Sequence, residues 1–161
     1  MKFTFFVLFF FLFLFNFFGQ TIDSKKSSKN NIYLDTSSSI FFSQISINYE
    51  HILYDGKKVS WYGRLGVGKT KLLFDDTKKN KNGTKNKNDS NTDFLCGVTL
   101  LTGKSNNHFE LDLGTYIGQY NGSSIIPIID LGYRYQKPIK GINFKLKIGS
   151  LGIGIGLGYN F

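Results

Sequence analysis

Residues 151–161 alternate strictly between large apolar residues and very small ones. Every even position from 152 to 158 is glycine, and every odd position carries an apolar side chain. A repeat of two residues is typical of a β-strand and incompatible with a helix. A glycine face covers water-exposed surface poorly, whereas a lipid-facing strand with a crowded interior accounts for both faces. We therefore predict a strand whose lipid-facing side chains are Leu151, Ile153, Ile155, Leu157, Tyr159 and Phe161.

Alternation with period two recurs along the chain and divides it into strands. Turn signals separate the alternating runs, from the short Asp55-Gly56 to the long polar stretch over 75–92. The sequence predicts an all-β fold, an eight-stranded antiparallel up-and-down transmembrane β-barrel preceded by a signal peptide. A six-stranded barrel with a free N-terminal tail remains open, because the first strand is short and carries Asp35. The eight predicted strands are 31–37, 40–54, 58–74, 93–103, 107–120, 124–137, 141–149 and 151–161.

An even number of strands places both ends of the barrel on the same side of the membrane. With these ends in the periplasm, the short turns near 55, 104 and 139 are periplasmic and the stretch over 75–92 is external, as in other outer-membrane barrels. Aromatic residues gather near strand ends, which predicts a ring at each membrane interface. The periplasmic ring comprises Tyr49, Trp61, Phe109, Tyr135, Tyr159 and Phe161, and the external ring Phe41, Phe42, Phe74, Phe94 and Tyr120.

The N-terminal region carries an apolar run that we interpret as the core of a signal peptide. Lys2 precedes a run from Phe3 to Phe15 that only Thr4 interrupts. This run is shorter than the roughly 20 apolar residues that a transmembrane helix needs. The predicted organisation is a signal peptide over 1–20, a polar linker over 21–30 and a barrel domain over 31–161. An uncleaved N-terminal anchor is the alternative.

Charged residues occupy the face opposite to the apolar one. An eight-stranded barrel has an interior only wide enough for side chains, and unpaired buried charges are costly. We therefore predict a network of ion pairs that fills the lumen, with a gated ion pathway or a small-ligand site as the alternative. The pairing depends on the strand register and stays open. The predicted lumen charge network contains four acids and four bases: Glu50, Arg64, Glu110, Asp112, Asp130, Arg134, Lys145 and Lys147.

A scarcity of cysteine and histidine limits the chemistry that the chain can perform. One cysteine excludes a disulfide framework, and two histidines leave little material for a zinc site. We expect no catalytic residues, no cofactor and no metal. His51 and His108 are predicted near the periplasmic strand ends, a bilayer away from outer-leaflet chemistry. Cys96 falls on the lipid-facing side of its strand, where we expect a packed apolar thiol.

The chain is strongly basic, with Lys+Arg 20 against Asp+Glu 11 and a formal net charge of +9. The stretch over 75–92 carries five lysines but also three aspartates, and it lacks aromatic residues that could stack on bases. These features argue against a nucleic-acid partner. They favour attraction to outer-membrane lipid, including the anionic headgroups of lipopolysaccharide.

Several segments resemble small outer-membrane β-barrel proteins of the Bacteroidetes type, which are similar in architecture to OmpA- and OmpX-type barrels. The resemblance covers 31–161 and rests most on 131–136 (LGYRYQ) and on 156–161 (GLGYNF), with support from 46–50 and 107–111. It implies a barrel in the outer membrane, and most members have no known activity. Leu157, Tyr159 and Phe161 look like the signal read by the barrel-assembly machinery, which implies that machinery as a partner.

These observations predict a monomeric β-barrel protein of the bacterial outer membrane with a structural, adhesive or envelope-maintenance role and no catalysis. The first alternative is a secreted or periplasmic lipocalin-like binder with an apolar cavity. The second is a lipid A-modifying enzyme, which would use a histidine with a serine and a carboxylate.

Overall fold

The structure of the chain, a computed structural model, describes residues 28–40, 42–72, 91–103, 105–119 and 123–161. Several predictions fall outside these ranges: the signal peptide over 1–20, most of the linker over 21–30, the polar stretch over 75–92 apart from its last two residues, and Phe41, Phe74 and Tyr120. The side chain of Phe42 is also not described.

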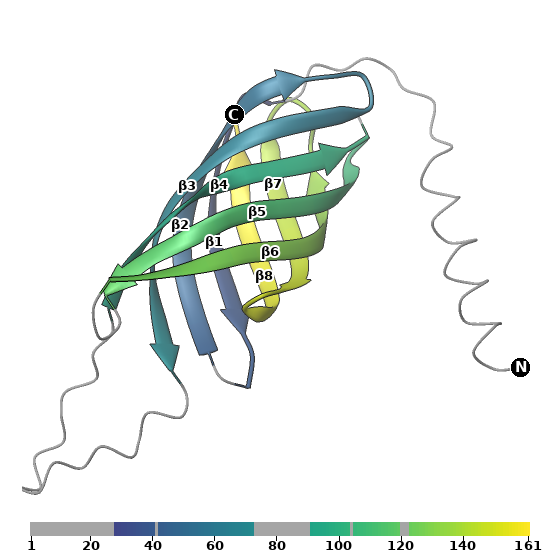
Figure 1. The fold of residues 1–161 in the computed structure, drawn as a ribbon. Coiled ribbons are helices and arrows are strands. Elements are labelled where there is room, and N and C mark those ends of the chain that lie inside the picture. Colours follow the sequence, from purple (N-terminus) through teal and green to yellow (C-terminus); the bar gives the residue numbers. More distant parts are fainter. Residues whose placement is uncertain (1–27, 41, 73–90, 104, 120–122) are drawn as a thin grey trace, which may run out of the picture.

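Eight antiparallel strands close into one barrel, and every regular element in the described ranges is a strand (Figure 1). This confirms the predicted all-β class and strand number, with boundaries that differ by a residue or two. The strands are β1 (Asn30–Ser38), β2 (Phe42–Asp55), β3 (Val59–Leu72), β4 (Asn91–Thr102), β5 (Asn107–Gln119), β6 (Ser123–Gln136), β7 (Gly141–Gly149) and β8 (Gly152–Asn160).

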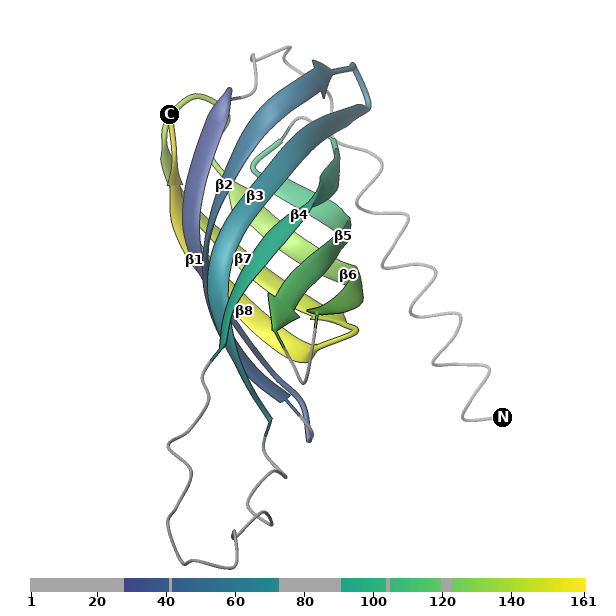
Figure 2. The same cartoon turned by 60° about the vertical axis from the view of Figure 1, so that its left-hand side comes forward.

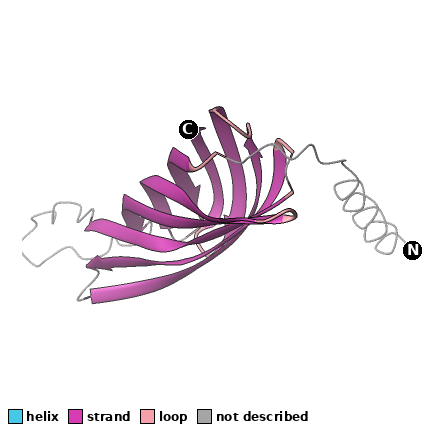
Figure 3. Cartoon of the chain, turned by 90° about the horizontal axis from the view of Figure 1, so that it is seen from above, coloured by secondary structure: helices cyan, strands magenta, loops and turns pink. Residues whose placement is uncertain are grey.

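The first strand closes the barrel, because β1 pairs with β2 on one side and with β8 on the other (Figure 2). The six-stranded alternative is therefore wrong. Following the paired Cα atoms once around the barrel shifts the register by about ten residues, so the strands tilt strongly against the barrel axis. Figure 3 shows the strands from above, following one another around the wall.

Side chains alternate between the outer surface and the interior along each strand. On β8, Leu157 exposes 60% of its surface and points outward, while Asn160 is buried and points inward. On β2, Ile47 is 59% exposed and Glu50 is fully buried. The exposed face of the barrel wall is therefore apolar and the buried face is polar, which is the reverse of an ordinary water-soluble protein.

The two ends of the barrel differ in their contents. At one end, here called the terminal end, Asn30 and Phe161 exchange two backbone hydrogen bonds, and the short turns after β2, β4 and β6 lie at this same end (Figure 1). Outward aromatic residues gather near it: Tyr49, Tyr54, Trp61, Phe109, Tyr133, Phe144, Tyr159 and Phe161. The opposite end, where β3 stops at Leu72 and β4 starts at Asn91, is called the loop end; of the predicted external ring, only the side chain of Phe94 is described there.

Leu151 departs from the predicted alternation. The sequence pattern places it on the outward face, but its side chain is buried in the interior with 3% exposure. The reason is the turn between β7 and β8, where Gly152 adopts a left-handed φ of 94° and β8 begins only after the chain has reversed. Strict alternation therefore holds only from Gly152 onward.

Candidate functional site

The most developed site among the described residues is the charged interior of the barrel. All eight residues predicted to form the lumen charge network point inward, and none exposes more than the 6% of Lys147. Five strands supply them: β2, β3, β5, β6 and β7. The interior holds two more acids, Asp35 and Asp93, so the predicted balance of four acids and four bases is wrong. The described part of the interior contains six acids and four bases.

Arg134 forms the centre of the part of the network nearest the terminal end. Its two terminal nitrogens donate to the two carboxylate oxygens of Glu50 at 2.7 and 2.8 Å, and its Nε donates to Glu110 at 2.5 Å. Lys145 Nζ lies 2.6 Å from Glu110 Oε1 and 3.4 Å from Glu50 Oε1. Two buried carboxylates and two buried cations thus compensate one another, which is the condition for burying them at all.

Arg64 and Lys147 organise the second part of the network. Arg64 donates to Asp35 at 3.1 Å and to Asp112 at 3.0 Å, each through a different nitrogen. Lys147 Nζ lies 2.5 Å from Asp35 and 3.3 Å from Asp130. Thr99 of β4 donates to Asp112 and to Glu50, and so links the two parts from a strand that contributes no cation.

Tyr33 of β1 sits between the cations of both parts. Lys145 Nζ lies 4.0 Å from its ring centre, and the guanidinium carbons of Arg64 and Arg134 lie at 5.5 and 5.9 Å. Its hydroxyl donates to Glu50 at 2.8 Å. The ring face attracts the three cations while the hydroxyl satisfies a carboxylate. Sequence reasoning did not include Tyr33 and Asp35, although the alternation of β1 places both inward.

The glycine face of β8 has a direct structural cause in this network. A Cβ added at Gly154 would lie 2.7 Å from Lys147 Cε, and one at Gly156 would lie 3.3 Å from Lys145 Cβ and Cδ. One at Gly158 would collide with Tyr33. The three long side chains therefore occupy the space that side chains on β8 would otherwise fill.

Polar side chains close the interior near the terminal end. Asn143 donates to Asn31 and to Asn160, and Gln136 donates to Ser28. On the terminal-end side of the network, Tyr62 donates to the carbonyl oxygen of Ser28 at 3.2 Å. Above it, toward the loop end, the interior turns apolar, with a cluster of Leu95, Tyr116, Ile128 and Leu151. Layers of side chains thus fill the bore along the described part of the barrel, as expected for eight strands.

Asp93 stands apart from the network. It exposes only 2% of its surface, yet neither carboxylate oxygen has a hydrogen-bond partner, and none of the ion pairs of the described residues includes it. The strand neighbours of Asp93, Gly68 and Gly118, present no side chain to it. An unpartnered buried charge is destabilising, so Asp93 opposes folding, whereas each of the other five interior acids has a cation partner.

We expect Asp93→Asn to raise the free energy of unfolding by about 1–3 kcal/mol, because it removes the charge and keeps the shape. Asp35→Asn is the matched control, and it should lower stability because Arg64 and Lys147 lose the negative charge that they share. Trp61, the single tryptophan, reports urea unfolding in detergent micelles by fluorescence. A fall in the urea midpoint for Asp93→Asn would mean that the carboxylate has a partner in solution.

The two histidines lie at the terminal end in hydrogen-bonded positions. His108 Nδ1 donates to the carbonyl oxygen of Thr102 at 2.8 Å, and His51 Nδ1 donates to Asn30 Oδ1 at 2.8 Å. No group of three or more metal-ligating side chains occurs among the described residues. The residues predicted as an assembly signal, Leu157, Tyr159 and Phe161, all point outward.

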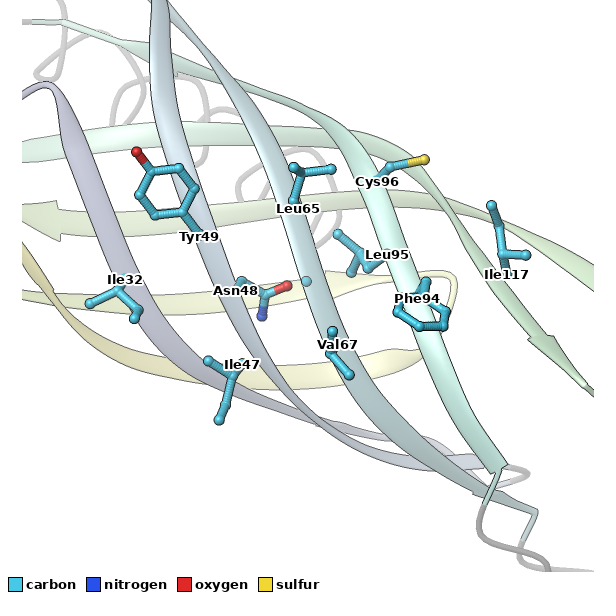
Figure 4. A pocket seen from close by; sticks show the side chains of 11 residues that line it. Ile32, Ile47, Asn48, Tyr49, Leu65, Val67, Phe94, Leu95, Cys96 and Ile117 are labelled. Carbon is cyan, nitrogen blue, oxygen red and sulfur yellow. The ribbon is translucent and has the colours of Figure 1, made fainter.

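The outer surface carries a groove of about 570 Å³ over β1 to β5, shown in Figure 4. Its walls are outward apolar side chains, and backbone and inner atoms of Asn48, Gly66 and Leu95 form its floor. Cys96 lines it and is exposed, as predicted for the lipid-facing side of β4. The remaining lining residues are Ile32, Ile47, Tyr49, Leu65, Val67, Phe94 and Ile117.

Comparison with known proteins finds no match among family models, curated proteins or solved structures. Within the described residues, no helix has the length and apolar character required to cross a bilayer.

Proposed function

We propose that this chain is an integral β-barrel protein of the bacterial outer membrane, with a structural, adhesive or envelope-maintenance role and a closed lumen. The observation that carries the proposal is the inverted polarity of the wall. Large apolar side chains stand exposed on all eight strands, while the interior holds ion pairs. A surface of this kind is stable against hydrocarbon and unstable against water.

The height of the outward apolar belt supports a membrane-spanning position. On β3 the outward residues run from Trp61 through Leu65 and Val67 to Lys69 and Lys71. Eight residues separate Trp61 from Lys69, a distance of about 26 Å along the strand and about 20 Å along the axis of a tilted strand. An aromatic residue at one limit and a cation at the other match a band of about 25 Å between two interfaces.

The filled interior supports a structural role over conduction. Arg134 and Arg64 each reach across the bore, from β6 to β2 and from β3 to β1 and β5. Opening a path for ions would require these buried pairs to separate, at a cost of several kcal/mol for each uncompensated charge. The network therefore acts as a permanent plug that also ties opposite walls together.

The two alternative functions have less support. A lipocalin-like binder needs an apolar cavity, whereas the centre of this barrel is occupied by ion pairs. A lipid A-modifying enzyme needs a histidine base beside a serine, whereas His108 bonds to a backbone carbonyl and His51 to an asparagine.

Electrophoresis of outer-membrane extracts, with and without boiling, tests the proposal. A folded barrel should resist cold detergent and change its mobility after heating. Leu65→Lys, in the middle of the belt and 63% exposed, should lower stability by about 2–4 kcal/mol if this surface meets lipid. Lys140→Leu in the exposed β6–β7 turn is the control and should leave the mobility shift unchanged. A soluble protein without a shift, in which Leu65→Lys is harmless, would overturn the proposal.

A further inference from the structure

The outer groove lies directly beside two lysines that form no ion pair with an acid in the described part of the chain. Lys69 and Lys71 occupy the next two outward positions of β3 after Val67, which lines the groove. Both are exposed, and neither takes part in an ion pair with any described residue. We propose that the groove and these two lysines form a binding site for one molecule of lipid A, a phosphorylated and acylated glycolipid. This inference rests on the membrane position proposed above.

Apolar walls make the groove suitable for hydrocarbon chains. Val67 and Phe94 stand at its loop-end rim, Leu65 and Cys96 line its middle, and Tyr49 lies on the terminal side (Figure 4). The Tyr49 hydroxyl donates to Asn30 at 2.9 Å, which holds the ring in place. The groove has a volume of about 570 Å³, within the range of small-molecule sites, and its open apolar surface offers an acyl chain continuous contact.

The polar rim has the chemistry that a phosphate requires. In the strand register Lys69 pairs with Thr92 of β4, and Lys71 pairs with Ser43 of β2. By the alternation of their strands all four side chains face outward at the same limit of the apolar belt, so two ammonium groups and two hydroxyl groups are available to one headgroup. Lysine binds phosphate as a point charge, and hydroxyl groups add hydrogen bonds.

The position of the rim selects the lipid. The lysines lie at the loop end, opposite to the end where Asn30 and Phe161 meet. If the termini are periplasmic, as proposed, the rim lies in the outer leaflet, where the phosphorylated lipid is lipid A. A phospholipid of the inner leaflet would meet the terminal end instead.

Cys96 provides the measurement, because it is the single cysteine and lies in the groove. Purified protein in detergent is treated with N-ethylmaleimide in the presence of increasing lipid A. Bound lipid A should slow alkylation of Cys96. Lys69→Gln with Lys71→Gln should raise the lipid A concentration needed for half-protection by about thirty-fold, at about five- to sixfold for each lysine. Lipid A without its phosphates should protect Cys96 of the natural protein as poorly as intact lipid A protects it in the double variant.

Lys57→Gln with Lys58→Gln is the matched control, because it removes two exposed lysines from the turn at the terminal end. It should leave protection unchanged. An equal loss of Cys96 protection in both double variants would mean that lipid A is attracted to a basic protein in general, and it would overturn the site. Protection of the natural protein by dephosphorylated lipid A equal to that by intact lipid A would overturn it as well. The mobility shift on heating is measured on the same samples. Natural protein that shifts on heating but is not protected by lipid A contradicts only the lipid site, whereas absence of the shift contradicts the membrane proposal.

Discussion

Replacing Arg134 by methionine should destabilise the barrel by about 3–5 kcal/mol, because it leaves two buried carboxylates with too few cations. Arg134 makes three hydrogen bonds to Glu50 and Glu110, all between 2.5 and 2.8 Å. Among the described residues, Lys145 would remain as the only cation paired with them, and it already lies 3.8 Å from Asp112. Urea unfolding followed by the fluorescence of Trp61 in micelles should show a much lower midpoint.

A second substitution distinguishes lost charge balance from lost packing. Adding Glu50→Gln to Arg134→Met removes one of the stranded carboxylates, so stability should recover by a large part of the loss. Lys140→Met removes a cation from an exposed turn and should change nothing measurable. If Arg134→Met unfolds at the wild-type urea concentration, the interior is well hydrated and the ion pairs do not hold the barrel together.

Replacing Gly97 by valine should cost at least about 4 kcal/mol and abolish the heat-dependent mobility shift. Gly97 of β4 and Gly114 of β5 are register partners that both face the interior. A Cβ at Gly97 would lie 2.8 Å from the Cα of Gly114, and it would also collide with the carbonyl oxygen of Leu113. Because these are backbone atoms, no rotamer change can relieve the contact, and the paired strands β4 and β5 would have to move apart.

Gly63→Val is the matched control for this prediction. A Cβ at Gly63 meets only the side chain of Leu53, at 3.4 Å, and Leu53 is 64% exposed and free to rotate away. The control should fold and shift on heating as the natural protein does. If Gly97→Val and Gly63→Val were equally stable, the contact between β4 and β5 would tolerate a side chain, contrary to the close approach in the structure.

Most of the fold follows from the sequence because one physical rule governs it. Period-two alternation assigns each strand and both faces, and turn residues separate the strands. The same rule assigns Glu50, Arg64, Arg134 and Lys145 to the interior, where the structure places them. A strand with one apolar face and one polar face leaves little freedom in the position of its charges.

What the sequence left open depends on register and on local backbone geometry. Glu50 and Arg134 are separated by 84 residues, and no local pattern indicates that they pair. Leu151 turns inward because it precedes a left-handed glycine in the turn before β8, where the alternation has not yet begun. In the sequence the charge of Asp35 argues against a first strand, whereas in the structure Arg64 and Lys147 form ion pairs with it inside the barrel. The pairing of β1 with β8 finally determines which charges meet.

The pairing of β1 with β8 also sets the order of events when the protein forms. Asn30 and Phe161 hydrogen-bond across nearly the whole described chain, and the contacts Asn31–Asn143 and Lys147–Asp35 each span 112 residues. The first strand therefore cannot be completed until the last one has been made, whichever hairpins form earlier. Contacts this distant in sequence are typical of slow folding, because the chain must close a long loop before it gains them. Until that moment the chain has two open strand edges, each able to pair with another molecule.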